Sequence, residues 1–179
     1  MRALILSLAL AATSTVAFAQ DAADTLVMQL KDGTVRIALD TENAPKHAER
    51  LKTLANQGFY DGLKFHRVIP GFMAQTGDPQ GTGMGGSDLP DLEAEFSDKP
   101  FKRGTVGMAR SQNPNSANSQ FFIMFEPAPH LNGAYTVVGE VVEGMEAVDA
   151  VKKGDLNANG AVDDPDTIVK MRTADQTDS

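Results

Sequence analysis

One stretch of this chain carries most of the information about its architecture: Phe65-His66-Arg67-Val68-Ile69-Pro70-Gly71-Phe72-Met73-Ala74-Gln75-Thr76-Gly77-Asp78. Its first five residues are rich in aromatic and β-branched side chains, which is typical of a strand. Pro70 and Gly71 are turn residues, because proline fixes φ and glycine tolerates positive φ. Residues 72–76 can form a second strand, which ends at Gly77. The stretch therefore predicts two strands joined by a tight turn.

Arg67 is the unusual residue of the first predicted strand. Side chains alternate along a strand, so Phe65, Arg67 and Ile69 are expected on one face. His66 and Val68 are expected on the other face. An arginine between two apolar residues extends to solvent, forms an ion pair, or stands at the edge of an apolar pocket where it contacts a ligand. A second motif is needed to choose among these three.

The second motif lies further along the chain. Gly107-Met108-Ala109-Arg110 leads into a polar loop at 111–118, which is followed by Ser119-Gln120-Phe121-Phe122-Ile123-Met124. Together the two motifs resemble the cyclophilin family of peptidyl-prolyl cis-trans isomerases. That family is marked by an F-H-R-x-I-P-x-F-M-x-Q-x-G-D segment and a later S-Q-F-F-I segment. A weaker resemblance extends from about residue 26 to about residue 171.

The rest of the chain is predicted to be mainly strands. Further candidates are residues 25–31, 34–39, 102–109, 119–125, 135–141 and 167–172, with a hairpin turn at Asp32-Gly33. One helix is expected from Pro45 to Gly58, with Ala48, Leu51, Leu54 and Ala55 on one face, and a second at 145–153. Many short strands with two helices are typical of a barrel or a sandwich. The resemblance implies an eight-stranded antiparallel closed β-barrel capped by two α-helices.

The first 19 residues have the pattern of a cleavable export signal. Arg2 is the positive residue, residues 3–12 are apolar, and Ala17-Phe18-Ala19 fits an A-x-A cleavage site. The apolar segment is too short for an uncleaved membrane anchor. We therefore expect a signal peptide at 1–19 and one cyclophilin-like isomerase domain at 20–179. The mature protein is expected in the periplasm, as a monomer that is free of the membrane.

Composition narrows the classes of partner. The chain has 16 basic and 24 acidic residues, a formal net charge of −8. This balance argues against nucleic acid or an anionic membrane surface as a partner. The absence of cysteine fits an oxidising compartment.

Rotation about an X-Pro bond needs few chemical groups. Amide resonance opposes rotation with a barrier of about 18–20 kcal/mol, but no bond between heavy atoms is broken. A cation that donates a hydrogen bond to the prolyl nitrogen stabilises the twisted state more than the planar state. An apolar slot must hold the proline ring while the neighbouring backbone is fixed. No cofactor and no metal are expected for this reaction.

The resemblance implies a role for each matching residue. Arg67 is the catalytic cation, and Gln75 orients both Arg67 and the substrate backbone, with Gln120 beside it. The backbone of Ala109 and Arg110 binds the residues that precede the proline. The proline slot is formed by Phe72, Met73, Phe122 and Leu131, whereas Phe121 is assigned to the core. The implied partners are proline-containing unfolded or folding polypeptides.

Three positions depart from the best-known family pattern. Arg110 stands where asparagine is common, which favours acidic substrate sequences. His130 stands at the pocket rim where tryptophan is frequent, so sensitivity to cyclosporin is left open. Tyr135 stands where histidine is frequent, and its hydroxyl can make a similar hydrogen bond. The last two departures keep an alternative open, in which the same barrel is a non-catalytic binding module or chaperone for proline-containing segments.

Other kinds of site are less well supported. His47, His66 and His130 lack metal-ligand spacing, and His66 is expected to be a hydrogen-bonded structural residue. Residues 81–86 lack the Lys-Ser/Thr pair of a phosphate-binding loop and are predicted to form a flexible wall of the substrate groove. Residues 155–166 match a calcium loop at positions one, three, five, six and nine. Position twelve is Asp166 instead of glutamate, so an acidic turn is favoured.

Overall fold

The computed structural model describes residues 21–177, so the predicted signal peptide at 1–19 lies outside the described residues. The strands are β1 (Thr25–Leu30), β2 (Gly33–Leu39), β3 (Arg67–Ile69), β4 (Met73–Thr76), β5 (Thr105–Met108), β6 (Phe121–Met124), β7 (Val137–Glu143) and β8 (Lys170–Thr173). The helices are α1 (Pro45–Asn56) and α2 (Met145–Asp149). Short 3-10 turns are η1 (Ala22–Asp24), η2 (Pro129–Leu131), η3 (Leu156–Ala158) and η4 (Ala174–Gln176). The predicted mainly β architecture is confirmed.

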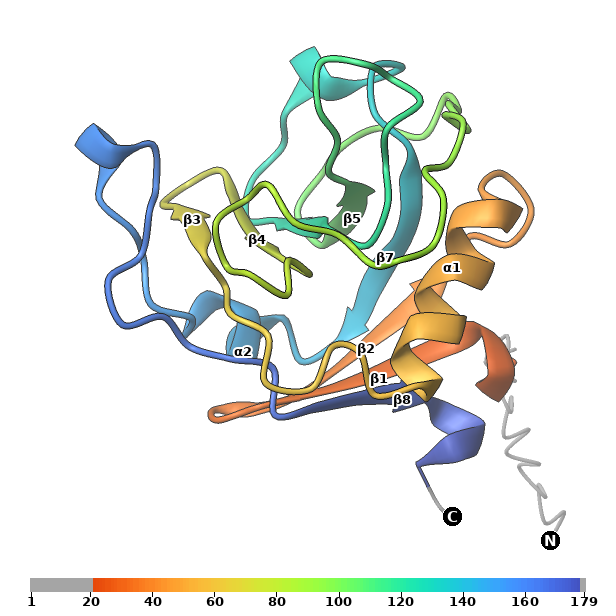
Figure 1. Ribbon diagram of the computed structural model, residues 1–179, viewed down its shortest axis with the longest axis horizontal. Coiled ribbons are helices and arrows are strands. Elements are labelled where there is room, and N and C mark those ends of the chain that lie inside the picture. Colours follow the sequence, from red (N-terminus) through yellow and green to blue (C-terminus); the bar gives the residue numbers. More distant parts are fainter. Residues whose placement is uncertain (1–20, 178–179) are drawn as a thin grey trace, which may run out of the picture.

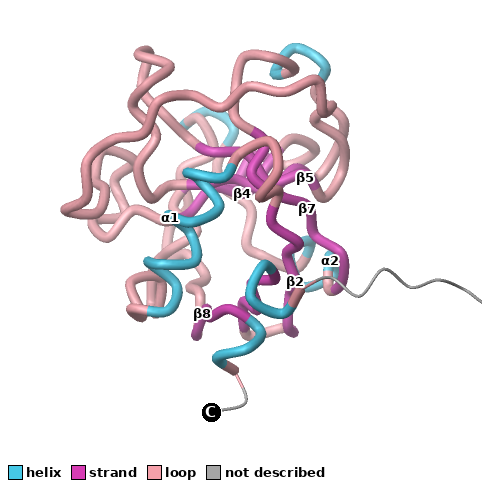
Figure 2. Tube along the Cα trace, turned by 90° about the vertical axis from the view of Figure 1, so that its right-hand side faces the viewer, coloured by secondary structure: helices cyan, strands magenta, loops and turns pink. Residues whose placement is uncertain are grey.

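The strands form one antiparallel sheet in the order β3-β4-β6-β5-β7-β2-β1-β8. Figure 1 shows β7 running between a lower group, β2, β1 and β8, and an upper group that contains β3, β4 and β5. In Figure 2 most of the loops gather around β4, β5 and β7, at the end of the molecule opposite β8. The sheet is therefore strongly curled.

The prediction of a closed barrel is not fully correct. Within the described residues no ladder pairs the edge strands β3 and β8. Instead, residues 154–168 lie between them: the N–H of Val68 donates to the carbonyl of Gly160 at 2.8 Å, and the N–H of Phe65 donates to that of Asp166 at 2.9 Å. Single hydrogen bonds to a loop, and not a strand pair, join the two edges. The fold is a curled half-barrel whose gap is filled by this loop.

The first strand of the central motif is shorter than predicted, and this changes one assignment. Because β3 begins at Arg67, strand alternation does not extend back to Phe65. Phe65 is fully buried and packs in the same core as Val68, whereas Ile69 packs on the opposite side of the sheet. The prediction that Phe65 shares a face with Arg67 and Ile69 is therefore wrong. Similarly, α2 ends at Asp149 and does not reach residue 153.

Apolar side chains form two separate clusters on the two faces of the sheet. The first, which we call the main core, includes Phe121 and Ile123 together with buried residues of α1 and α2. The second cluster consists of Met73, Phe101, Phe122, Met124, Ala128, Leu131 and Val137. Side chains alternate along β6, so Phe121 and Ile123 face the main core while Phe122 and Met124 face the second cluster. The assignment of Phe121 to the core is confirmed.

Helix α1 covers the main core with the predicted face. Ala48, Leu51, Leu54 and Ala55 are all buried there. Pro45 is the first helical residue, and Gly58, with φ of 76°, follows the end of the helix in the left-handed conformation that glycine tolerates. Among residues 21–177 no helix is both long enough and apolar enough to cross a membrane.

The start of α1 is capped from a distant part of the chain. Its N-cap residue, Ala44, has no side chain that can accept a hydrogen bond. The carboxylate of Glu95 takes this place, accepting from the backbone N–H groups of Lys46 at 3.2 Å and His47 at 3.1 Å. It also contacts the ring Nδ1 of the fully buried His47 at 2.6 Å. A negative charge at this end of a helix also interacts favourably with the helix dipole.

Candidate active site

A cavity of about 700 Å³ opens over the second cluster. Its lining includes all of the predicted site residues except Gln120, namely Arg67, Phe72, Met73, Gln75, Ala109, Arg110, Phe122, His130, Leu131 and Tyr135. Gln120 lines an adjoining cavity, which shares Gln75, Ala109 and Arg110 with the first. Strands, loops and the η2 turn thus bring together residues that are far apart in the sequence.

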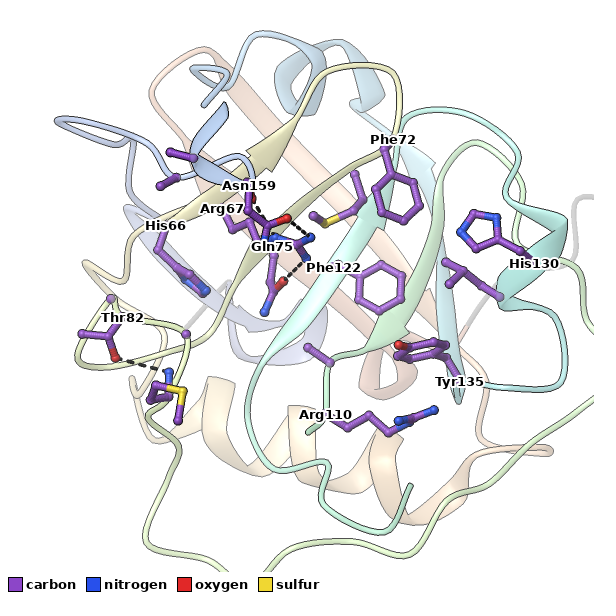
Figure 3. A pocket seen from close by; sticks show the side chains of 18 residues that line it. His66, Arg67, Phe72, Gln75, Thr82, Arg110, Phe122, His130, Tyr135 and Asn159 are labelled. Carbon is purple, nitrogen blue, oxygen red and sulfur yellow. Dashed lines mark hydrogen bonds between the residues drawn. The ribbon is translucent and has the colours of Figure 1, made fainter. Parts of the chain in front are cut away.

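One side of the cavity is an apolar slot built on Phe122. The Phe122 ring stacks on Phe101 with centroids 5.7 Å apart, and it meets the Tyr135 ring edge-on at 5.9 Å. Phe72 lies at the rim, where its ring faces His130 at 5.7 Å. Figure 3 shows these four labelled rings, Phe72, Phe122, His130 and Tyr135, on the same side of Arg67. Such a concave apolar surface suits a small ring of a ligand.

The other side of the cavity is polar and centres on Arg67. Its Nη1 donates to the side-chain oxygen of Gln75 at 3.2 Å. Its Nε donates to the backbone carbonyl of Asn159 at 3.0 Å, and its Nη2 to Asn159 Oδ1 at 2.9 Å. Figure 3 shows the guanidinium between these two residues. Partial burial lowers the pKa of Arg67, but arginine does not lose its proton in proteins, so the site keeps its positive charge.

Strand register explains why the slot and the cation are neighbours. Arg67 on β3 lies opposite Gln75 on β4, and Gln75 lies opposite Phe122 on β6. Directly opposed residues of antiparallel strands project from the same face of a sheet. Arg67, Gln75 and Phe122 therefore form one row across three strands, which places the charge beside the apolar slot.

A chain of amides links this row to the glycine-rich loop. Gln75 donates from its side-chain nitrogen to Gln120 Oε1 at 2.9 Å. Gln120 in turn donates to the carbonyls of Gly83 and Gly85 at 3.1 and 2.8 Å. The predicted position of Gln120 beside Gln75 is confirmed. The geometry places Gln120 behind Gln75, where it holds the loop and does not line the main cavity.

The loop of residues 81–86 forms a wall of the cavity but is not loosely held. Gly81, Thr82, Gly83 and Met84 line the cavity. Asp78 is buried at the base of the loop, where its carboxylate accepts from the N–H groups of Thr82 and Gly83 at 2.8 and 2.6 Å. Burial opposes the charge on Asp78, yet the backbone N–H donors prevail and lower its pKa. The glycines thus allow a tight turn around a carboxylate instead of a flexible flap.

Arg110 supports the rim of the cavity. Its guanidinium donates to the carbonyls of Ala134 at 2.7 Å and Ser111 at 2.9 Å, and lies over the Tyr135 ring at 4.3 Å from the centroid. The backbone of Ala109 and Arg110 was predicted to bind the substrate. The N–H of Ala109 already donates to the carbonyl of Gln120 at 3.0 Å, so this N–H is not one of the groups that can bind a substrate.

His66 does not behave as predicted. The residue is buried and lines the cavity, but neither ring nitrogen has a hydrogen-bond partner among residues 21–177. The prediction of a hydrogen-bonded structural histidine is therefore not confirmed. Burial lowers the pKa of His66, and the nearby charge of Asp78 opposes that shift only in part. A neutral imidazole at the cavity wall leaves Arg67 as the cation of this side.

Asn159 was not among the predicted site residues, although it holds Arg67 by two hydrogen bonds. Ala158 and Ala161 of the same loop also line the cavity. The side-chain oxygen that would be position five of the calcium-loop pattern is thus occupied by a guanidinium. Among the described residues there is also no group of three or more His, Cys, Asp or Glu side chains that could hold a metal ion. The only local signal for Asn159 was the Asn159-Gly160 pair, which is typical of a turn.

Comparison with known proteins identifies the family. The family model described as Cyclophilin type peptidyl-prolyl cis-trans isomerase/CLD matches residues 25–173. A probable peptidyl-prolyl cis-trans isomerase of Brucella suis is 56% identical over 179 residues, covering 94% of this chain and 91% of the relative. Peptidyl-prolyl cis-trans isomerase B of Bacillus subtilis is 44% identical over 129 residues, covering 71% of this chain and 90% of the relative.

Solved structures agree in fold. A cyclophilin from Hirschia baltica superposes with a TM-score of 0.78 at 26% identity, covering 87% of this chain and 76% of that one. A cyclophilin-type isomerase from Cryptosporidium parvum, solved in the presence of the dipeptide Ala-Pro, has a TM-score of 0.76 at 29% identity and covers 83% of this chain and 98% of that one. The chain therefore belongs to the family of cyclophilin-type peptidyl-prolyl cis-trans isomerases.

Proposed function

We propose that this protein accelerates rotation about X-Pro peptide bonds of folding polypeptides, and that Arg67 stabilises the twisted bond. The row of Arg67, Gln75 and Phe122 across three strands is the observation that carries this proposal. It sets a permanent charge beside an apolar slot, as the reaction requires. The activity itself follows from membership of the family, while the role of each residue is our proposal.

The hydrogen bonds of Arg67 leave it able to act on a substrate. A guanidinium has five N–H donors. Three of them donate to Asn159 and Gln75, so two remain for a ligand in the cavity. When an X-Pro bond twists, resonance is lost and the lone pair localises on the prolyl nitrogen. A donor of Arg67 binds that lone pair more strongly in the twisted state than in the planar state, which lowers the barrier.

Besides the hydrogen bond to the prolyl nitrogen, the reaction requires that the proline ring be bound in a fixed position, and the apolar slot does this. Met73, Phe122 and Leu131 are buried side chains with one surface toward the cavity, and Phe72 is half-buried at its rim. A ring held there cannot turn with the rest of the peptide, so rotation is confined to the X-Pro bond. The Cryptosporidium parvum relative was solved in the presence of Ala-Pro, a dipeptide with such a ring.

The location and assembly of the protein are also proposals. The export-signal pattern of residues 1–19 supports a periplasmic protein that is freed from the membrane by cleavage. The acidic balance supports a protein that stays clear of anionic membranes, and we propose that it is a monomer. Cell fractionation with mass spectrometry of the mature N-terminus tests the first two points, because cleavage predicts a chain that starts at Gln20. Light scattering tests the third.

The decisive experiment follows cis–trans exchange of a short X-Pro peptide by NMR, with the native protein and with Arg67→Ala. Removing one preorganised donor of this kind lowers a rate by a factor of about 10²–10³. We expect Arg67→Ala to lose that much catalysis and still unfold at the same denaturant concentration. Arg36→Ala is the matched control, since the Arg36 side chain lies outside the cavity lining and its one ion pair among residues 21–177 is with the exposed Glu143.

Two results would contradict the proposal. If the native protein binds the peptide without accelerating its exchange, the barrel is a binding module, the alternative raised by His130 and Tyr135. If Arg67→Ala accelerates exchange as well as the native protein does, the isomerase activity stands but another group supplies the stabilisation.

A further inference from the structure

We propose that Asn159 is the positioning residue of Arg67, and that the loop of residues 154–161 is thereby a working part of the active site. This inference rests on the proposed role of Arg67. It gives a function to the segment whose sequence matches a calcium loop only in part.

The first argument is the geometry at the guanidinium. Asn159 accepts from Nε with its backbone carbonyl and from Nη2 with its side-chain oxygen, at 3.0 and 2.9 Å. Two acceptors from one residue on one edge of a planar fork set both its position and its tilt. Gln75 holds the remaining nitrogen through a single hydrogen bond. Asn159 therefore contributes more to the orientation of Arg67 than Gln75 does.

The second argument is the backbone conformation that presents both acceptors. Asn159 ends the η3 turn in the left-handed region, with φ of 54° and ψ of 34°. Asparagine is among the few non-glycine residues that enter this region readily. Without the left-handed turn, the carbonyl and the side-chain oxygen would not both reach the same guanidinium. The residue type is thus suited to the backbone and to the contact at once.

The third argument is how tightly the loop is held to the strand that carries Arg67. Val68, the next residue of β3, donates to the carbonyl of Gly160 and accepts from the N–H of Gly154, both at 2.8 Å. A Cβ on Gly160 would lie 2.5 Å from Ile69 Cγ1, and one on Gly154 would collide with the carbonyl of Gly160. The loop therefore packs against β3 more closely than side chains allow. Asn159 is held at a set distance from Arg67 because its neighbours are anchored on either side.

The fourth argument explains the acidic start of the loop. Asp155 accepts from the N–H of Asn157 at 2.8 Å, which caps the η3 turn. Its role in the structure is to shape the turn that ends at Asn159. The resemblance to a calcium loop then reflects a shared need for tight turns with oxygen acceptors, and the cation that this loop holds is the arginine of the same chain.

The test compares three variants for kcat and KM on an X-Pro peptide. Asn159→Gly keeps the left-handed backbone and the carbonyl but removes the side-chain oxygen, and we expect a fall in kcat of about three- to tenfold with KM unchanged. Asn159→Asp restores an oxygen at the same place and is expected to recover most of the loss. Asn113→Gly, which removes an exposed asparagine side chain outside residues 154–161 and outside the lining of both cavities, is the control and should match the native protein.

A spectroscopic measurement separates positioning from a merely structural role. The Nη2–H of Arg67 is bound by Asn159 Oδ1, which Asn159→Gly removes, so the NMR signal of this proton should exchange faster with water in the variant, while the denaturation midpoint stays the same. If kcat and the Nη2–H exchange are unchanged in Asn159→Gly, the inference fails. It also fails if Asn159→Asp does not recover activity. If Arg67→Ala retains full activity, the proposed function of Arg67 fails instead, which is a separate result.

Discussion

The main core and the second cluster share the strands β4, β6 and β7 and serve different ends. On β6, Phe121 and Ile123 enter the main core, while Phe122 and Met124 enter the second cluster. Helices α1 and α2 contribute buried side chains to the main core but none to the second cluster. The apolar surface that the helices cover stabilises the fold, and the surface that they leave uncovered becomes the floor of the cavity.

The difference shows that the chemistry of the side chains does not by itself separate a core from a binding slot. Phe121 and Phe122 are adjacent in sequence and almost equally buried, at 0% and 5% exposure. What differs is the layer above each ring: other core residues above Phe121, and a cavity edged by Arg67 and Gln75 near Phe122. An apolar patch with a few convergent polar groups is the usual form of a ligand site.

The largest expected effect comes from truncating each of these two rings. Phe121→Ala should lower the free energy of unfolding by about 3–5 kcal/mol, because the cavity it leaves in the main core cannot collapse fully. Phe122→Ala should lower it by less, since its ring already borders a cavity, but should abolish measurable binding of an X-Pro peptide. Urea denaturation and peptide titration measure the two effects. Equal losses of stability with intact peptide binding in both variants would remove the distinction between the two clusters.

A smaller effect is expected from filling space beneath the slot. Gly107 lies opposite Phe122, and an added Cβ would lie 2.5 Å from Phe122 Cζ and 2.6 Å from Phe101 Cε1. Since the two rings are stacked, Gly107→Ala must push them toward the cavity, and overpacking of this kind costs about 1–3 kcal/mol of stability. We expect weaker peptide binding together with that loss. Unchanged peptide affinity would mean that the strain is relieved away from the slot.

Substitution of Arg110 is expected to change selectivity more than stability. Its guanidinium lies over the Tyr135 ring, and because both residues are half-buried the contact is worth about 1 kcal/mol. The positive charge at the rim should favour an acidic residue before the proline. In Arg110→Ala the ratio of kcat/KM for a Glu-Pro peptide to that for a Lys-Pro peptide should fall by a factor of about two to five, the worth of one solvent-accessible ion pair. Arg110→Lys keeps the charge and should keep most of the ratio; a ratio that is equal in all three proteins would contradict the prediction.

The smallest expected effect is the pH dependence of the unfolding free energy that is caused by His47, a residue of the helix that covers the main core. Burial lowers the pKa of His47 on α1, and the carboxylate of Glu95 opposes that shift only in part. In the unfolded chain this histidine binds a proton as the pH falls below about 6.5. In the folded chain it does so only at a lower pH. His47 therefore contributes stability above about pH 6.5, and this contribution is lost as the pH falls toward its lower folded-state pKa.

Urea denaturation at pH 7, 6 and 5 measures this dependence. The native protein should lose more unfolding free energy between pH 7 and pH 5 than His47→Gln does. The remaining pH dependence of the variant includes His66, whose pKa is also lowered by burial. A slope that is identical in both proteins would show that His47 keeps the same proton occupancy in the folded and unfolded states.

Local patterns in the sequence were enough to find the strands and helices, and the motifs were enough to find most of the cavity lining. Proline at the start of α1, glycine after its end and the apolar face between them act over a few residues, so they can be read directly. The same holds for the alternation of Phe121 and Phe122. The family resemblance then assigned Arg67, Gln75 and the slot residues to one site, and the structure places them around one cavity.

The contacts that the sequence did not reveal join distant parts of the chain. Arg67 and Asn159 are 92 positions apart, and the cap of α1 reaches from Glu95 across 48 positions. The same kind of contact, between residues 62–68 and 154–168, joins the edges of the half-barrel and removes Phe65 from the expected strand. Periodicity and turn chemistry constrain only neighbouring residues, so they predict the elements. Which loop fills the gap beside β3, and which acceptor then meets Arg67, depends on how those elements pack.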